Sequence, residues 1–490
     1  MTRPRPARRL GPVIGLALLP AACYPAPVDS IPSSAYGSFW YALNVLGGRG
    51  GYSQQTLRRV EHEGQTYVEA TDRTRIQVKL GAQTLTASRE EMRRYDADLR
   101  LVRLEHQSDQ FGRKLRLTAE YSDGKLHVTR EAPDGVTRRE LDVPDNFGFD
   151  LTPLQALGEG ALDADWTATF TTYDTELDNL DTVELAVGER LGEPEAGWKL
   201  SSRSGQLKVT SYSWMSDSGI LLRQEVPEVM NLSMELVTEE EALREVSPLL
   251  LSGDVRVEQA LGDPTDLTEL RLRVTVATGS AADLFANTAR QLIEPEDHQA
   301  VITVRAATAP TRTVRLPVDV DELRPFLTPS DTAQSDNPQI QAKAREIVGD
   351  ETDAWSAVGR LRQWVNVSLR KVSSEPRPIS ASEVLAEMAG DCTEHSILMA
   401  ALCQAVGIPV KLVAGLAYSG GAFHYHAWNE VWVGEWTEVD ATWDEELVDA
   451  GHLQVAAGAL DSTSLARLSL MAGRTLGSLH LEVLDHKTKP

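Results

Sequence analysis

Cysteine is scarce in this chain, which has three cysteines in 490 residues: Cys23, Cys392 and Cys403. The last two fall eleven positions apart in one predicted helix, which separates them by about 16 Å along its axis and excludes a disulfide between them. Cys403 stands among apolar residues and fits an ordinary core position, since an unpaired cysteine packs as a small hydrophobic side chain. Cys392 therefore needs another explanation.

Basic residues are also few. The chain has 48 lysines and arginines against 72 aspartates and glutamates, which gives a net charge of −24. An acidic surface of this strength repels phosphate backbones, so we predict no nucleic-acid partner. The hydrophobic fraction of 42% is typical of globular proteins. A chain of this length predicts two to four domains.

The one long apolar run stands at the N-terminus, over residues 10–22. Four arginines precede it, as in an export signal: Arg3, Arg5, Arg8 and Arg9. The run is too short to span a bilayer as a helix of the mature protein. We therefore expect the protein to be exported.

The end of this run resembles a bacterial lipoprotein signal. Small residues precede Cys23, the position at which such proteins are lipidated, although Pro20 stands where they usually have leucine or a similar residue. We expect residues 1–23 to be a signal peptide of this type. Lipidated Cys23 would anchor the protein to the membrane, facing the periplasm or the cell surface. Cleavage without lipidation would instead leave a soluble secreted protein.

Residues 24–250 are predicted to form a β-rich N-terminal domain. Apolar and polar residues alternate in runs such as 115–121 and 125–130, and Ser122-Asp123-Gly124 between them is typical of a hairpin turn. A large antiparallel sheet fits this pattern. Such a sheet suits either a carrier of lipid or peptide, or a scaffold. A second β-rich stretch predicts a middle domain over 251–325.

The sequence changes character over 326–490, where amphipathic helices precede strands. We expect helices at 339–348, 353–369, 382–388 and 391–406, followed by strands at 410–418, 424–433 and 436–440. Cys392 then lies in the first turn of a helix, where unsatisfied N–H groups and the helix dipole favour a thiolate. The turn at Gly434-Glu435 pairs the strand of His426 with that of Asp440. A thiol, an imidazole and a carboxylate in this relation are typical of nucleophilic catalysis.

Three motifs in this region resemble those of the transglutaminase-like superfamily. They are Gly390-Asp391-Cys392-Thr393-Glu394-His395, His426-Ala427-Trp428-Asn429-Glu430-Val431 and Val439-Asp440-Ala441-Thr442-Trp443. The resemblance runs from about 325 to 485 and includes Asp449-Ala450-Gly451-His452-Leu453. It implies an α+β fold with a papain-like transglutaminase core, preceded by the β-rich domains. It also implies Cys392 as nucleophile, His426 as general base and then acid, and Asp440 as the orienting carboxylate.

The predicted activity is thiol-dependent acyl transfer at the cell envelope, with a protein or peptide as substrate. We favour hydrolysis of peptide or amide bonds, since nothing in the sequence indicates a site for an amine acceptor. A crosslinking transglutaminase and a non-catalytic binding or assembly module are the alternatives. No cofactor and no metal is predicted.

Several nearby residues have a second interpretation. His424 lies on the same strand face as His426 and is its rival, and His395 either lines the site or caps local polar groups. Zinc bound by Cys392, His395, His424 and His426 would suit the ligand types but would leave Asp440 unused. Glu438 is expected on a solvated strand face.

Overall fold

The fold contains both helices and strands, as predicted, but it is mostly β. The structure is a computed structural model and describes residues 27–490, except 81–82, 111–112, 134, 195, 246–248, 252–253, 277–279, 373–379 and 478. The predicted signal peptide and Cys23 lie outside the described residues. No helix of the described chain is long and apolar enough to cross a membrane.

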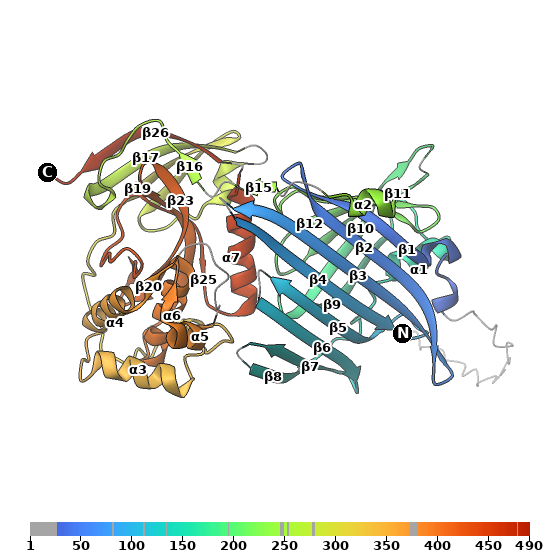
Figure 1. Cartoon of the computed structure of the whole chain (residues 1–490), viewed down its shortest axis with the longest axis horizontal. Helices are drawn as coiled ribbons and strands as arrows, with labels where there is room; N and C mark the ends of the chain where they lie inside the picture. Colours follow the sequence, from blue (N-terminus) through green and yellow to red (C-terminus); the bar gives the residue numbers. More distant parts are fainter. Residues whose placement is uncertain are drawn as a thin grey trace, which may run out of the picture.

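A 15-stranded sheet forms the N-terminal part of the molecule (Figure 1). Its strands pair in the order β8-β7-β6-β5-β4-β3-β2-β1-β14-β13-β12-β11-β10-β9, and β15 pairs with β3. The strands are β1 (Gly37–Val45), β2 (Gly48–His62), β3 (Gln65–Leu80), β4 (Gln83–Tyr95), β5 (Leu101–Gln110), β6 (Arg113–Ser122), β7 (Lys125–Ala132), β8 (Gly135–Asp142), β9 (Thr167–Asp174), β10 (Asn179–Leu191), β11 (Gly197–Ser204), β12 (Thr210–Ser216), β13 (Leu221–Val226), β14 (Leu232–Val237) and β15 (Leu249–Leu251). Two short helices accompany them, α1 (Thr152–Gly158) and α2 (Glu239–Leu243).

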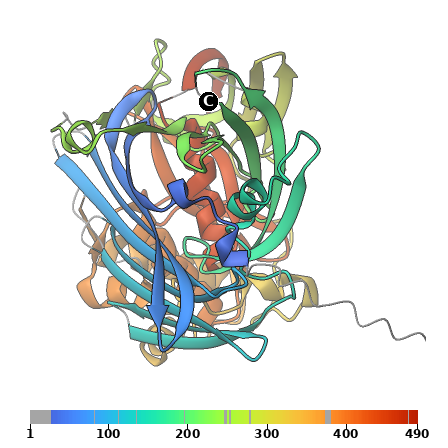
Figure 2. The same cartoon turned by 90° about the vertical axis from the view of Figure 1, so that its right-hand side faces the viewer.

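The order of this sheet follows from short hairpins between successive strands. The predicted hairpin is confirmed: Ser122 pairs with Lys125 across Asp123 and Gly124. Both turn residues have positive φ, at 53° and 76°, as a two-residue turn matched to the strand twist requires. Seen from the side, the blue strands β1–β4 and the green strands β9–β14 curve around a shared interior (Figure 2).

This interior holds a cavity of about 390 Å³. Its wall is mainly apolar and includes Phe39, Leu57 and Leu200, while Glu91 and Arg93 stand together at one side. The volume lies within the range of small-molecule sites. A carrier role for this domain stays a prediction.

The middle of the chain forms a second, four-stranded sheet with the order β18-β19-β17-β26. Three of its strands are β17 (Leu267–Val276), β18 (Gln291–Glu296) and β19 (Gln299–Arg305), and the fourth is the C-terminal strand β26 (Leu479–Thr488). β26 pairs antiparallel with β17 along its length. The end of the chain, predicted within the domain 326–490, therefore returns to the middle sheet.

A third sheet carries the predicted site and lies between two layers. Its order is β16-β23-β22-β25, with β24 on β23. The strands are β16 (Asp254–Arg256), β22 (Val410–Ser419), β23 (Ala422–Trp432), β24 (Trp436–Val439) and β25 (His452–Gly458). One face packs against the helices and the other shares a core with the middle sheet, where Leu416 and Leu453 meet Leu270 and Leu272. The predicted boundary at 325 therefore does not separate two cores.

The helices of this part cover the outer face of the third sheet (Figure 1). They are α3 (Pro338–Val348), α4 (Ala354–Ser368), α5 (Ala381–Glu387) and α6 (Cys392–Ala405). Two further short strands, β20 (Arg370–Lys371) and β21 (Ala389–Gly390), pair with each other, and β21 ends shortly before α6 begins. The predicted start of α5 was one residue late, because Ser380 caps a helix that begins at Ala381. Helix α7 (Ser462–Thr475) packs on β25.

Candidate active site

Helix α6 begins at Cys392, and its start is fixed by a reciprocal cap. The Asp391 carboxylate accepts the N–H of Thr393 at 2.9 Å, and the Glu394 carboxylate accepts the N–H of Asp391 at 2.9 Å. This arrangement occupies two of the free donors at a helix start. Cys392 is half-buried, while the residues that follow it in the helix are almost all buried. The thiol therefore stands where a buried helix begins.

Two side chains attach α6 to strand β23 beside the site. The Ser396 hydroxyl lies 2.7 Å from the carbonyl oxygen of Cys392 and 2.9 Å from that of Ala427. The Asn429 amide donates to the carbonyl oxygen of Ser396 at 3.1 Å. Buried hydrogen bonds of this kind are costly to leave unmade. They hold the first turn of α6 next to the strand position of His426.

Strands β23 and β24 bring His426 and Asp440 together, as the hairpin predicts. Asn429 pairs with Val439 and Trp432 with Trp436. Asp440 follows β24 directly, and its Oδ2 accepts the Nε2–H of His426 at 2.7 Å. Both side chains are buried. A carboxylate only accepts, so this bond assigns the proton to Nε2 and leaves Nδ1 for another partner.

The side chain of Cys392, at the start of α6, is near enough to interact electrostatically with the His426 ring. Burial alone would lower the pKa of His426. The charge of Asp440, its hydrogen bond and the contact with Cys392 outweigh burial and raise that pKa to about 9. The structure thus brings the three predicted residues together, with the His426 ring hydrogen-bonded to Asp440 and interacting with Cys392.

Asp440 is held on both of its oxygens. Its Oδ1 accepts the backbone N–H of Thr442 at 2.6 Å and that of Trp443 at 3.3 Å. Burial would raise the pKa of Asp440, but the charge and hydrogen bond of His426 lower it far below its ordinary value. The carboxylate is therefore ionised and unable to rotate without losing several hydrogen bonds.

Indole rings flank the imidazole. Trp443 stacks on His426 with ring centroids 4.4 Å apart and planes at 23°, and Trp428 lies on the other side at 6.0 Å. Aromatic faces attract cations, so this stacking favours the protonated ring. Trp428 fits because position 415 is glycine: a Cβ there would lie 2.6 Å from the indole.

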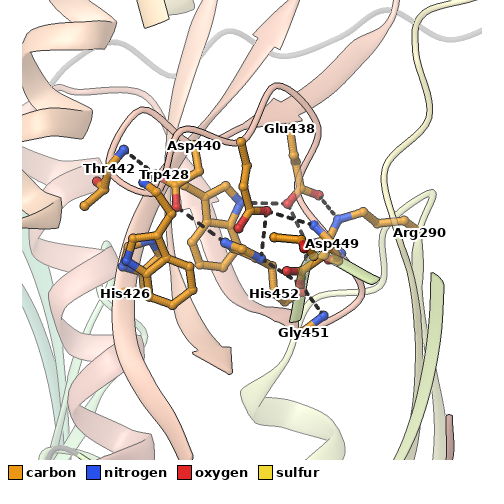
Figure 3. A network of polar contacts seen from close by, with 12 residues as sticks. Arg290, His426, Trp428, Glu438, Asp440, Thr442, Asp449, Gly451 and His452 are labelled. Carbon is orange, nitrogen blue, oxygen red and sulfur yellow. Dashed lines mark hydrogen bonds and ion pairs between the residues drawn. The ribbon is translucent and has the colours of Figure 1, made fainter. Parts of the chain in front are cut away.

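Arg290 is a residue of this network that no sequence pattern had indicated (Figure 3). It comes from the segment before β18 and makes a two-pronged ion pair with Glu438, at 2.6 and 2.7 Å. Glu438 also accepts the indole N–H of Trp428 at 2.7 Å. The prediction of a solvated Glu438 is wrong, because the middle sheet covers that strand face and leaves the residue 5% exposed. Burial would raise the pKa of Glu438, but the Arg290 guanidinium lowers it.

His452 is the second residue of the network that was not selected. It begins β25 and is fully buried, with Nε2 3.5 Å from the same Asp440 oxygen that His426 uses. Its Nδ1 lies 3.2 Å from Asp449 Oδ1 (Figure 3). The Asp449–Leu453 motif contained the signal, since it places a carboxylate and an imidazole three residues apart near the end of the region of resemblance.

The rival residues lie elsewhere. His424 pairs with Asp254 of β16 at 2.7 Å and is well exposed. His395 Nδ1 bonds the carbonyl of Asp391 at 2.6 Å, and burial lowers its pKa. His395 therefore caps local polar groups.

Two clusters of the described residues bring three possible metal ligands within 4.8 Å: His426, Asp440 and His452, and Glu445, Asp449 and His452. Of the four predicted zinc ligands, only His426 belongs to either cluster, and Cys392, His395 and His424 do not. The described residues therefore do not support the zinc interpretation. In both clusters the His452 ring already faces carboxylates. The absence of a metal or cofactor stays a prediction.

The part of the chain that contains these elements is similar to a known protein family. Residues 341–441 match the family model of the transglutaminase-like superfamily. This match confirms the predicted resemblance for the segment from α3 to Ala441. The transglutaminase-like region belongs to a family of thiol-dependent enzymes. No curated protein matches the chain.

Solved structures are also similar to parts of the chain. One is a candidate cysteine protease from Cytophaga hutchinsonii, 21% identical, with a TM-score of 0.32 over 46% of this chain and 90% of that protein. Another is a candidate protease from Parabacteroides distasonis, 12% identical, with a TM-score of 0.20 over 82% of this chain and 70% of that protein.

The buried ion pair next to the transglutaminase-like site predicts a large effect on stability. Arg290→Met leaves Glu438 buried without its cation and should lower the free energy of unfolding by about 3–5 kcal/mol, measured by urea denaturation. The double variant Arg290→Met/Glu438→Gln should recover much of this loss, since no unpaired charge remains.

The more exposed pair of Arg305 and Glu269, on β19 and β17 of the middle sheet, is the control. Arg305→Met should cost less than about 1 kcal/mol. An Arg290→Met variant as stable as Arg305→Met would contradict the importance of the buried pair.

Proposed function

We propose that this protein is a cysteine-dependent hydrolase of peptide or amide bonds, with Cys392, His426 and Asp440 as its catalytic residues. The observation that carries the proposal is the position of the His426 ring. One nitrogen is hydrogen-bonded to buried Asp440 at 2.7 Å, and the ring interacts electrostatically with the Cys392 side chain at the start of α6. An imidazolium beside a thiol stabilises the thiolate, which is the nucleophilic form.

The proposed reaction has two halves. The Cys392 sulfur attacks the amide carbonyl carbon, a C–S bond forms, and the C–N bond breaks as His426 donates its proton to the leaving nitrogen. Water then attacks the thioester while His426 takes a proton from it. The C–S bond breaks, which releases a carboxylic acid and restores the thiol. Asp440 remains ionised throughout and stabilises the imidazolium.

The acceptor in the second half decides between hydrolysis and transamidation. Water gives hydrolysis, and a primary amine gives a new amide. We favour water, because nothing in the sequence indicates a site for an amine acceptor. The crosslinking transglutaminase is the alternative, and incorporation of a fluorescent amine into protein in place of ammonia or amine release would favour it.

The location belongs to the same proposal. The basic residues before the apolar run and the small residues before Cys23 support export and a lipid anchor at the cell envelope. Proteins or peptides of that compartment are the substrates we propose. The net charge of −24 supports the absence of a nucleic-acid partner.

Selective alkylation tests the catalytic assignment. At pH 6 iodoacetamide should label wild-type protein once, at a rate at least about tenfold above that of a free cysteine, because the ion pair maintains a thiolate. Cys392→Ala should abolish this labelling, and His426→Ala should slow it about tenfold. Intact-mass spectrometry over time measures both.

Cys403 provides an internal control in the same helix. It is fully buried, and burial raises its pKa well above the ordinary range. Cys403→Ala should therefore label as the wild type does. Slow labelling that ignores His426 would show that the three residues do not act together and would favour a binding module.

The anchor is tested with the complete chain in a bacterial host. Wild-type protein should sediment with membranes and incorporate an alkyne fatty acid, whereas Cys23→Ala should do neither. Export of the variant to the periplasm is the control for an intact signal. Membrane association that persists without Cys23 would overturn the lipid anchor.

A further inference from the structure

His426 is not the only imidazole on Asp440. His452 lies on the same carboxylate oxygen, with its Nε2 3.5 Å from Oδ2, compared with 2.7 Å for His426. The two rings are 5.8 Å apart between centroids and inclined by 65°. They reach Asp440 from different strands, His426 from β23 and His452 from the start of β25. Asp440 is therefore shared between two buried rings.

The surroundings of His452 require a charged ring. Asp440 faces its Nε2, while Asp449 at 3.2 Å and Glu445 at 3.9 Å face its Nδ1. A neutral imidazole donates one hydrogen bond, whereas an imidazolium presents an N–H to the carboxylates on both sides. A fourth carboxylate nearby, that of Glu438, is already neutralised by Arg290. The carboxyl group of Asp449 is 4% exposed, and burying it is costly unless a positively charged ring stands beside it.

The backbone and the indoles fix the position of this ring. The carbonyl oxygen of His452 accepts a hydrogen bond from Arg290 Nη2 at 2.7 Å. The edge of the imidazole meets Trp428 at 5.1 Å and Trp443 at 5.5 Å, with planes nearly perpendicular. The same two indoles flank His426. His452, Asp440 and His426 therefore form one packed unit.

We propose that His452 is a positioning residue, resting on the proposed function, whose charged ring fixes Asp440 and draws part of the carboxylate's charge away from His426. Asp440 alone would hold the proton on His426 so strongly that the imidazolium becomes a poor acid for the leaving nitrogen. The positive charge of His452 weakens the attraction between Asp440 and the His426 proton and so lowers the pKa of His426. His452 thus keeps His426 able both to accept and to release a proton.

The pKa of His426 is the direct readout, and it needs no substrate. Replacing the charged ring by a neutral amide in His452→Gln removes a positive charge 5.8 Å from His426. Coulomb's law at an effective dielectric constant of about 20 then gives a rise of roughly 1–2 pH units in the pKa of His426. NMR titration of carbon-13-labelled histidine in the full mature protein measures it, with the signal assigned from His426→Gln. The alkylation rate of Cys392 at pH 6 should stay within about threefold of the wild type.

The matched control is another buried histidine beside a carboxylate. His106 lies 3.2 Å from Glu91 in the N-terminal sheet and is 2% exposed. His106→Gln should leave the titration of His426 unchanged. His452→Asn is a second neutral replacement of the same ring, and it should raise the pKa of His426 in the same direction.

Two results would overturn the proposal: an unchanged or lowered pKa of His426 in folded His452→Gln, or equal losses of alkylation and stability that mark a purely structural role. Should His452→Gln not fold, an unchanged titration of His426 in folded His452→Asn overturns the proposal as well. If the proposed function is wrong, the experiment gives a different result: Cys392 of the wild type is alkylated slowly. The two can therefore fail separately.

Discussion

The hydrogen bond between His426 and Asp440 is the interaction around which the C-terminal half of the molecule is organised. It joins Asp440, directly after β24, to His426 on β23 at the open end of their hairpin, and both side chains are buried. A carboxylate and an imidazole out of water are costly unless each is paired. Here, backbone N–H groups donate to Asp440, an indole stacks on the His426 ring, and the imidazole of His452 lies 3.5 Å from the Asp440 carboxylate. These contacts offset the cost of burial.

The same requirement explains why the middle sheet is packed against the third sheet. Without that layer, Glu438 and Trp428 would face solvent, and the wall behind His426 would be open. The middle sheet supplies a shared apolar core and Arg290, whose ion pair with Glu438 is buried. Return of the C-terminal strand β26 to β17 closes this layer. The thiol-dependent site is thus built on a scaffold of two sheets and not on the matched segment alone.

Sequence patterns predicted the elements that depend on local signals. The cap before Cys392, the turn at Gly434-Glu435 and the alternation along the strands are properties of a few neighbouring residues, and they are sufficient to bring Cys392, His426 and Asp440 close together. The start of α5 was misplaced by one residue because Ser380 and Ser382 are both acceptable caps.

The errors concern contacts between distant residues. Glu438 reads as solvent-facing because its partner Arg290 stands 148 positions earlier and no local pattern connects them. Asp440 follows β24, which pairs with β23, whereas His452 begins β25, which pairs with β22. His452 therefore reaches Asp440 only through the order of strands in the third sheet. Strand β26 has no neighbour in sequence with which to pair. These features depend on how layers pack, which periodicity within one segment does not determine.

The thiolate itself is the most direct test of the account. Its ultraviolet absorbance at pH 6, measured on the mature protein and compared with Cys392→Ala, reports the ionised sulfur without any substrate or alkylating reagent. The account predicts one thiolate per chain in the wild type, none in Cys392→Ala and a marked loss in His426→Ala. A wild-type spectrum identical to that of Cys392→Ala at this pH would contradict it.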